Sequence, residues 1–469
     1  IGGDLYTRKK KKDLVIAVKE GTEYKITAVV TGEDLGLVKK RSLKKVSINN
    51  QLRGQLRGAL ALLNLDNPDA GERLVAVNEL LDSIDAENAA LLREGLVKES
   101  DPDVRDAMEL GIALGEVTSK DPAVRLQAIA VLDGNLHPSA FNRLTTLVEQ
   151  EDDNDVRVAA QAAINSIDLK RQMSGIAETL FFGLSLGSVL VLAAIGLAIT
   201  FGVMGVINMA HGELIMLGAY TTYLLQVVMP EYPGVALLLS IPVAFLVSGG
   251  VGVLIERGVI RFLYGRPLET LLATFGISLI LQQFVRVVIS PQNVPVSNPS
   301  WMSGSIEISN VLSLTWNRIY IIVFSLMVFA ALFMILKKTA LGLQVRAVAQ
   351  NRAMARAMGV RSERVDALTF GLGSGIAGIA GVALSQLTNV GPNLGQSYII
   401  DSFMVVVFGG VGNLWGTLVA GMTLGVANKI MEPWAGAVLA KILVLVFIIL
   451  FIQKRPRGLF PQKGRAAEG

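Results

Sequence analysis

The sequence contains no cysteine and only two histidines, His137 and His211. Without cysteine the chain has no disulfide bond, no thiolate metal site and no cysteine nucleophile. Two histidines are too few for a metal centre built on several imidazoles. These absences argue against a metalloenzyme and predict a chain that holds no cofactor.

Charged side chains are also scarce, at 17% of the 469 residues, where a soluble domain carries roughly a quarter. The shortage lies in residues 171–469, which contain 20 basic and 11 acidic residues, whereas residues 1–170 contain 23 and 28. The mean hydropathy of +0.51 is too high for a soluble protein of 50.1 kDa. The composition excludes a disordered chain, a coiled coil and a cytosolic enzyme. It indicates a polar domain joined near residue 170 to an apolar one.

The apolar part contains stretches long enough to cross a membrane, because a helix of roughly 20 residues spans the hydrocarbon core. They fall at about 179–206, 213–229, 235–255, 268–289, 319–336, 366–388 and 437–453. A further apolar segment, 401–427, is interrupted by four glycines and an asparagine, namely Gly409, Gly410, Gly412, Asn413 and Gly416. The expected fold of residues 171–469 is therefore an all-α membrane domain with re-entrant or broken helices.

Basic residues orient these spans, because cytoplasmic loops are enriched in lysine and arginine. Basic clusters occur at 257–266, 337–364 and 454–465. An even number of crossings between the last two clusters requires 401–427 to form a re-entrant hairpin or two short helices. Counting back from the first cluster places residues 1–170 in the periplasm. If 203–226 is itself re-entrant, one crossing is lost and residues 1–170 lie in the cytoplasm instead.

The polar part divides into a short strand-containing segment, 1–50, and a helical region, 51–170. Strand-like runs occur at 14–18 and 24–30, and four similar helix starts carry Arg73, Arg105, Arg125 and Arg157. An Asp-Pro pair, present at two of these starts, caps a helix and sets its first turn. The pattern resembles HEAT-type repeats, in which stacked helix pairs share a core. The alternative is a small irregular helical bundle. The basic run at 8–12 is interpreted as a solvated cluster, so no nucleic-acid partner is expected.

The sequence has no nucleotide-binding loop, no readable Ser/His/Asp arrangement and few carboxylates in its apolar part. An enzyme is therefore the weaker class of function, and a conduit with sparse polar groups at membrane depth is the stronger one. Asn208, His211 and Glu213 lie between apolar runs. They either line a path beside a broken helix or belong to a short cytoplasmic turn.

Three further segments leave similar alternatives open. In 266–283, three polar residues share one helical face, either as a lined path or as interhelical hydrogen bonds. In 408–417, half-helix ends either expose backbone groups to a solute or pack through small residues. The basic amphipathic stretch 339–360 either docks on a protein or lies on anionic headgroups. The three polar residues are Thr274, Ser278 and Gln282.

Several motifs follow one another over nearly all of 180–460. They are Gly187-Ser188, Gly196-Leu197, Asn208-Met209-Ala210-His211-Gly212-Glu213, Leu217-Gly218-Ala219-Tyr220, Thr274 to Gln282, Gly342 to Gly359, Phe408 to Asn413 and Arg455 to Phe460. In these motifs the chain resembles the permease family of branched-chain amino acid ABC importers. The long extension before the first span is atypical of the amino-acid members and resembles the urea-type branch of that family.

The resemblance implies a polytopic helical permease of the bacterial inner membrane, with no enzymatic activity of its own. The implied partners are a homologous second permease, two cytoplasmic ATPases and an extracytoplasmic binding protein, besides the lipid bilayer. The loop 340–360 then corresponds to the family's ATPase-contacting loop. Its candidate coupling residues are Gly342, Arg346, Arg352 and Gly359.

Urea is the expected solute, because neutral donors and acceptors can bind it without a charged partner. The candidate path residues are Asn208, His211, Glu213, Thr274, Gln282, Gly409, Gly410, Gly412 and Asn413. Among them, His211 and Glu213 are expected to shape or gate the path rather than to contact the solute. The alternatives are a branched-chain amino acid as solute, and a passive channel or secondary transporter with an external sensor domain.

Overall fold

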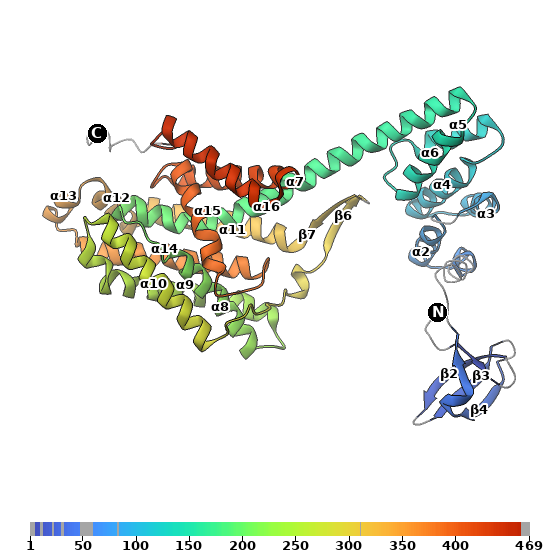
Figure 1. Ribbon diagram of the computed structural model, residues 1–469, viewed down its shortest axis with the longest axis horizontal. Coiled ribbons are helices and arrows are strands. Elements are labelled where there is room, and N and C mark those ends of the chain that lie inside the picture. The colour runs from blue at the N-terminus through green and yellow to red at the C-terminus, as the bar shows by residue number, and fades with distance from the viewer. Residues whose placement is uncertain are drawn as a thin grey trace. The chain divides into compact units, whose positions relative to one another are not determined.

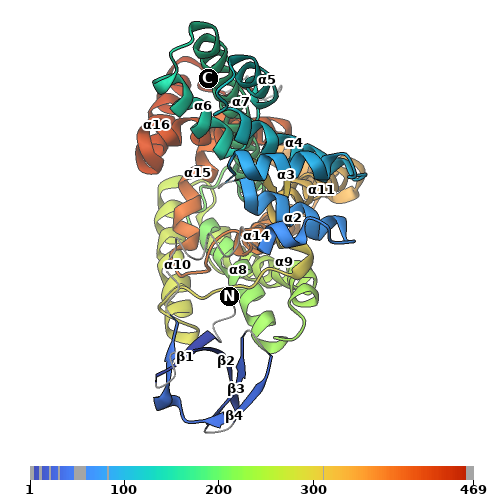
Figure 2. The same ribbon diagram turned by 90° about the vertical axis from the view of Figure 1, so that its right-hand side faces the viewer.

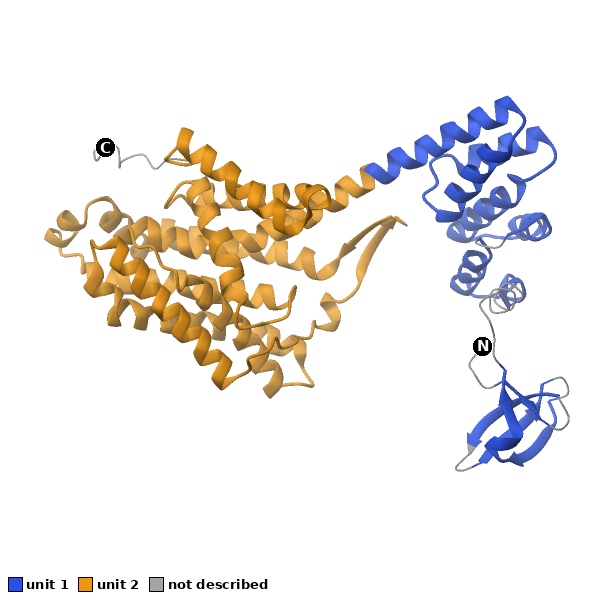
Figure 3. Ribbon diagram, viewed as in Figure 1, with its two compact units in different colours: residues 1–172 blue, residues 173–469 orange. Residues whose placement is uncertain are grey.

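A computed structural model describes residues 5–9, 13–20, 23–29, 32–46, 60–81, 84–309 and 311–460. The chain forms two compact units, residues 1–172 and 173–469 (Figure 3). The expected boundary between the strand segment and the helical region, at residue 50, lies outside the described residues.

The first unit begins with a small antiparallel sheet in the order β4-β3-β2-β1-β5. The strands are β1 Leu5–Arg8, β2 Leu14–Glu20, β3 Glu23–Ala28, β4 Asp34–Val38 and β5 Leu43–Lys45, with a 3-10 turn, η1 Lys40–Ser42, before the last. Because the chain returns so that β5 pairs with β1, the strands curl toward a barrel (Figure 2). Alternate residues of β2 face its small core, where Ala17 lies opposite Ile26 of β3. The predicted strand runs at 14–18 and 24–30 thus fall largely within β2 and β3.

Helices follow in the same unit. They are α2 Ala70–Leu81, α3 Ala86–Leu96, α4 Pro102–Glu116, α5 Pro122–Leu132, α6 Pro138–Gln150 and the first part of α7 Asn154–Met204. One apolar core runs through all of them, from Ala76 to Ile167. The structure thus contains a continuous set of packed helices where the sequence predicts either HEAT-like repeats or an irregular bundle.

The four helix starts singled out in the sequence share one geometry. Each begins with an aspartate whose carboxylate accepts backbone N–H bonds of the first turn, and each has an arginine four residues later. The aspartates are Asp69, Asp101, Asp121 and Asp153. Aspartate at this position satisfies N–H groups that the helix leaves unpaired. The two ion pairs Arg73–Glu99 and Arg125–Glu151 join residues at the same spacing of 26, so part of the geometry repeats along the chain.

The second unit is almost entirely helical. After α7 come α8 His211–Val228, α9 Pro233–Gly258, η2 Ile260–Leu263, α10 Pro267–Val288, η3 Ser300–Met302, the hairpin β6 Ser305–Ser309 and β7 Leu312–Thr315, α11 Trp316–Lys338, α12 Ala340–Gln350, α13 Arg352–Ala357, α14 Ser362–Ser385, α15 Leu394–Gly409 and α16 Leu414–Lys454. Within the described residues, α7, α9, α10, α11, α14 and α16 are long and apolar enough to cross a membrane.

Helix α14 is the centre of this unit and packs against both α8 and α9 (Figure 1). The contact is close because small residues meet. A Cβ on Gly378 would lie 2.5 Å from the carbonyl oxygen of Ala244 in α9. By contrast, α9, α10, α11 and the second half of α16 carry many exposed large apolar side chains. Exposed apolar faces of this extent are typical of helices that pack against lipid or another subunit.

Two expected spans differ from the observed helices. The stretch 213–229 forms α8, which is buried inside the unit and is not among the six long apolar helices, because it carries several polar residues along with Glu213. The broken segment 401–427 consists of two helices, α15 and α16, that meet at a glycine turn. Helix α16 continues through the predicted span 437–453 and bends at Gly436, where φ is 77°.

Candidate functional site

The segment between α7 and α8 is non-helical, as its glycines and asparagine suggest. Helix α7 ends at Met204, and the chain resumes helical geometry at His211. The Asn208 side-chain oxygen accepts the backbone N–H of Ala210 at 3.0 Å. From α10, the Thr274 hydroxyl accepts the backbone N–H of Met209 at 3.1 Å. Two side chains from distant parts of the chain thus hold the irregular segment in place.

His211 and Glu213 open α8 and are both buried. The His211 ring Nε2 lies 2.8 Å from the carbonyl oxygen of Ala193 in α7. A carbonyl only accepts, so Nε2 carries the proton and donates. The Ser278 hydroxyl of α10 donates to Glu213 Oε1 at 3.0 Å. His211 therefore ties α8 to α7, and Glu213 ties α8 to α10.

The polar face of α10 is buried as predicted. Thr274, Ser278 and Gln282 all point inward, and Gln282 Nε2 donates to Pro392 O at 3.2 Å and to Asn393 Oδ1 at 3.0 Å. Each of the three side chains thus bonds to another segment of the chain. These bonds favour interhelical hydrogen bonding over a lined path. Thr274 and Ser278 bond this face to Met209 and Glu213 of the 208–213 segment. The predicted site residues of the segment and the face are Asn208, His211, Glu213, Thr274 and Gln282, of which His211 points to Ala193 of α7 instead.

This group of residues, the α10 cluster, retains unused hydrogen-bonding atoms. Within the described part of the chain, Asn208 Nδ2, His211 Nδ1 and Glu213 Oε2 are buried without a partner. An unpaired buried polar atom is costly, so such atoms mark sites where water or a ligand binds. The cluster thus offers one donor and two acceptors. No group of histidine, aspartate and glutamate in the described residues could hold a metal ion.

The glycine turn is a separate structure. Helix α15 ends at Gly409, and Gly410, with φ 106°, reverses the chain. Asn413 caps α16 by accepting the Gly416 N–H at 3.2 Å and donates to Phe460 O at 3.2 Å. Cβ atoms on Gly409 or Gly416 would collide with the opposing backbone. These close contacts favour the packing alternative for this segment.

The turn lies away from the α10 cluster. A Cβ on Gly202 of α7 would lie 2.5 Å from Gly412, whereas His211 bonds to Ala193 of the same helix. Nine residues of helix separate these two points, which is about 14 Å. The structure does not bring Gly409, Gly410, Gly412 and Asn413 together with the other predicted path residues.

The predicted coupling loop consists of α12 and α13. Its glycines have structural roles: a Cβ on Gly342 would overlap the carbonyl oxygen of Leu336, and Gly359 ends α13 with φ 87°. The Arg346 guanidinium points back toward α11 and donates to Leu336 O. Residues that the sequence analysis did not select are more prominent on this surface. Three large apolar side chains are exposed there, Leu343 at 63%, Met354 at 61% and Met358 at 78%.

Arg352 is half-buried and bonds to the helices of the second unit. It donates to both carboxylate oxygens of Asp366 in α14, at 2.7 and 2.9 Å. Its guanidinium carbon also lies 4.9 Å from the centre of the Tyr264 ring. Tyr264 in turn donates to Glu256 of α9 at 3.1 Å. These contacts fix the loop to α14 and α9 of the second unit.

Several charged residues of this interior were not predicted from the sequence. Besides Asp366 and Glu256, the pair Asp401–Lys441 joins α15 to α16 at 3.0 Å. Acidic residues are so few in 171–469 that each one inside an apolar helix is a signal, because an intramembrane charge needs a partner. Rarity was therefore a usable criterion, although the partners are not adjacent in sequence.

Comparison with known proteins adds the family. A family model described as branched-chain amino acid transport system, permease component, matches residues 179–452. The high-affinity branched-chain amino acid transport system permease protein LivH of Salmonella typhimurium is 29% identical over 291 residues, covering 60% of this chain and 94% of LivH. BraD of Pseudomonas aeruginosa is 29% identical over 292 residues, with the same coverage. The ribose import permease protein RbsC of Haemophilus influenzae is 24% identical over 258 residues, covering 52% of this chain and 74% of RbsC.

No solved structure matches the chain. The family match covers more than half of the sequence and nearly all of the second unit. Together with the six long apolar helices, it identifies a multi-pass protein of the inner membrane and a transport subunit rather than an enzyme. The chain belongs to the permease component family of branched-chain amino acid transport systems.

Proposed function

We propose that the chain is one of two permeases of an ATP-driven importer for a small polar solute, with urea as the solute. A homologous permease completes the path, two cytoplasmic ATPases drive it, and an extracytoplasmic binding protein delivers the solute. ATP-driven closure of the ATPases moves α12 and α13, and the membrane helices shift between outward and inward access.

The observation that carries the urea proposal is the set of unused atoms in the α10 cluster. Asn208 Nδ2 is a free donor, and Glu213 Oε2 is a free acceptor. This proposal gives Glu213 a solute contact, in place of the shaping or gating role expected from the sequence. Urea has one carbonyl acceptor and four N–H donors, so it matches both. The rest of the buried face of α10, from Thr274 to Gln282, is neutral.

A branched-chain amino acid is the second candidate, and two observations favour it. The relatives LivH and BraD are branched-chain amino acid permeases by name. The cluster also ends in a cation, since Arg286 donates to Asn393 Oδ1 at 2.8 Å, and Gln282 bonds to the same oxygen. Glu213 and Arg286 together provide one charge of each sign, as an ammonium and a carboxylate require.

Contact with the ATPases is assigned to the α12–α13 surface. Leu343, Met354 and Met358 provide its apolar area, while Gly342 and Gly359 shape the helices that carry it. Arg352 transmits motion from this surface to α14 and α9 through Asp366 and Tyr264.

Uptake into proteoliposomes containing the complete transporter tests the function and the solute together. We expect ATP-dependent uptake of labelled urea that unlabelled urea, but not leucine, suppresses. Suppression by leucine alone would assign the amino acid instead. Uptake that persists without the ATPases would contradict the importer and support a channel.

Substitution within the cluster tests the site. Asn208→Ala removes the free donor and is expected to raise the KM for urea about fivefold, the effect of one hydrogen bond. Ser240→Ala is the control, because the Ser240 hydroxyl is also buried but donates within α9 to Leu237 O. Equal increases in the KM for urea from the two substitutions would contradict the assignment of Asn208 as a solute-binding residue.

A further inference from the structure

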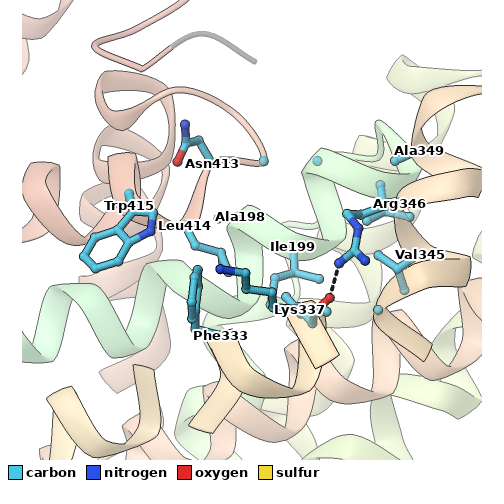
Figure 4. Close-up of a pocket in the computed structure, with 15 residues that line it drawn as sticks. Ala198, Ile199, Phe333, Lys337, Val345, Arg346, Ala349, Asn413, Leu414 and Trp415 are labelled. Atoms are coloured by element: carbon cyan, nitrogen blue, oxygen red, sulfur yellow. Dashed lines mark hydrogen bonds between the residues drawn. The ribbon is translucent and has the colours of Figure 1, made fainter. Parts of the chain in front are cut away.

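A pocket of about 330 Å³ lies between the end of α7, the end of α11, α12 and the start of α16 (Figure 4). Its wall is mainly apolar, and none of its lining residues is acidic. Two cations, Lys337 and Arg346, are the charged groups of the lining. Neither enters an ion pair with any carboxylate in the described part of the chain.

The two cations are exposed, and each also contacts the pocket wall. Lys337 Nζ lies 5.3 Å from the centre of the Phe333 ring. Arg346 donates to the carbonyl oxygen of Leu336, and this bond crosses from α12 to the last turn of α11 (Figure 4). The bond uses one of the five N–H groups of the guanidinium. Positive charge without a protein counterion favours an anionic occupant.

The apolar wall continues from the cations onto an exposed face. Trp415, which is 53% exposed, packs edge-on against Phe333 with ring centres 5.7 Å apart. The Trp415 ring also contacts Phe329, which lies one turn before Phe333 in α11, with ring centres 5.4 Å apart. Tryptophan is enriched where a protein crosses the headgroup region. The pocket thus has a cationic end near the loop and an aromatic surface that runs along a membrane helix.

We propose that this pocket binds an anionic phospholipid of the cytoplasmic leaflet, with its phosphate at Lys337 and Arg346 and an acyl chain along Phe333 and Trp415. Basic pockets between membrane helices on the cytoplasmic side recognise such headgroups. Because Val345 and Arg346 line the pocket from α12, the bound lipid joins α12 to α11 and α16. The lipid is then a structural component behind the loop, independent of the solute that the permease carries.

The test is lipid retention by the purified full-length chain in native mass spectrometry. Phosphatidylglycerol and phosphatidylcholine with identical acyl chains are supplied in equal amounts. We expect preferential retention of one phosphatidylglycerol. Lys337→Gln and Arg346→Gln should each weaken retention about fivefold, the contribution of one cation near a lipid surface. The control is Lys338→Gln, which removes the adjacent charge outside the pocket.

A second variant tests the apolar part. Ala349→Phe places a ring in the pocket from α12 and is expected to displace the lipid while both cations remain. Equal retention of the two lipids, or unchanged retention in the cation variants, would overturn the proposal. Displacement by millimolar inorganic phosphate would reduce the pocket to a free-anion site. Loss of the lipid when the second permease and the ATPases are bound would assign the pocket to a subunit contact, which also overturns it.

Discussion

Buried charges in this protein have specific partners, and Asp366 is the clearest case. Its side chain is 1% exposed and receives two bonds from Arg352. A carboxylate with this degree of burial depends on its partner, because an uncompensated buried charge is more costly than the pair is favourable. Arg352 is therefore one of the side chains that hold the loop 340–360 in position, together with Arg346 and Arg356.

Arg352→Gln is expected to destabilise the protein by about 1–3 kcal/mol, since it leaves a buried acceptor unpaired. The midpoint of thermal unfolding in detergent should fall, and solute-stimulated ATP hydrolysis in the complete transporter should fall with it. Arg364→Gln is the control, because it removes an exposed arginine from the first turn of α14, close to the loop. The double variant Arg352→Gln/Asp366→Asn should recover part of the stability. No recovery would show that the pair is not the cause.

Glu99 makes the stability of the first unit depend on pH. Hydrogen bonds from Arg73, together with backbone N–H bonds, lower the pKa of Glu99 to about 2 from an ordinary value of 4.5. A carboxyl group whose pKa is lower in the folded state contributes stability above its unfolded pKa. That contribution is lost as the pH falls from 4.5 to 2.

Glu99→Gln should therefore increase hydrogen exchange in α2–α4 at pH 7, measured by mass spectrometry on the full chain. The difference from the unsubstituted protein should shrink between pH 4.5 and 2, after correction for intrinsic exchange rates. Glu94→Gln replaces an exposed carboxylate nearby and should have no such effect. A difference that stays constant with pH would contradict the role of the Arg73–Glu99 pair.

At the scale of helices, local signals in the sequence were informative and distant contacts were not. The aspartates that start α4 and α5 were recognisable because capping depends on neighbouring residues. The inward face of α10 followed from the spacing of Thr274, Ser278 and Gln282. What that face touches depends on segments 65 to 111 residues away. No periodicity encodes those distances.

The loop 340–360 shows the same limit. Its amphipathic helix was predicted, but the residues chosen in it were glycines and arginines. In the structure, Arg352 and Arg346 bond inward, and Leu343 and Met354 face outward. The sequence alone does not distinguish a basic loop residue that binds a partner protein from one that bonds to its own chain.

The exposed apolar residues lead to a prediction for α12. Leu343→Asp should abolish co-purification of the ATPases, because it places a charge in an apolar contact area. The unfolding midpoint of the isolated chain should not change, since the side chain is 63% exposed. Gln344→Ala, at the next exposed position on α12, should retain the ATPases. If the ATPases still co-purify with the Leu343→Asp variant, α12 is not part of the contact with them.

At the scale of the whole molecule, the number of helices determines which side of the membrane each end occupies. Helix α14 leads away from the basic loop, α15 returns, and α16 bends at Gly436 into two parts. Four helical segments then separate the basic loop from the basic tail. This even number agrees with both ends being cytoplasmic. The side occupied by residues 1–172 depends on α7, α8 and α9, which precede the first basic cluster. Helix α8 is buried and less apolar than its neighbours. A crossing α8 and a re-entrant α8 place residues 1–172 on opposite sides, so a measurement of the side they occupy separates the two.

The absence of cysteine makes that measurement direct, because any introduced thiol is the only one in the chain. We propose that residues 1–172 are periplasmic, as three crossings before residue 256 require. In cells with a permeabilised outer membrane, Gln150→Cys should then react with a membrane-impermeant maleimide. Gln344→Cys, in the basic loop, should react only after lysis. Protection of both thiols until lysis would place residues 1–172 in the cytoplasm. The number of crossings before residue 256 would then be even, with α7 and α9 crossing and α8 a re-entrant element. Reaction of Gln344→Cys in intact cells would instead reverse the orientation inferred from the basic residues.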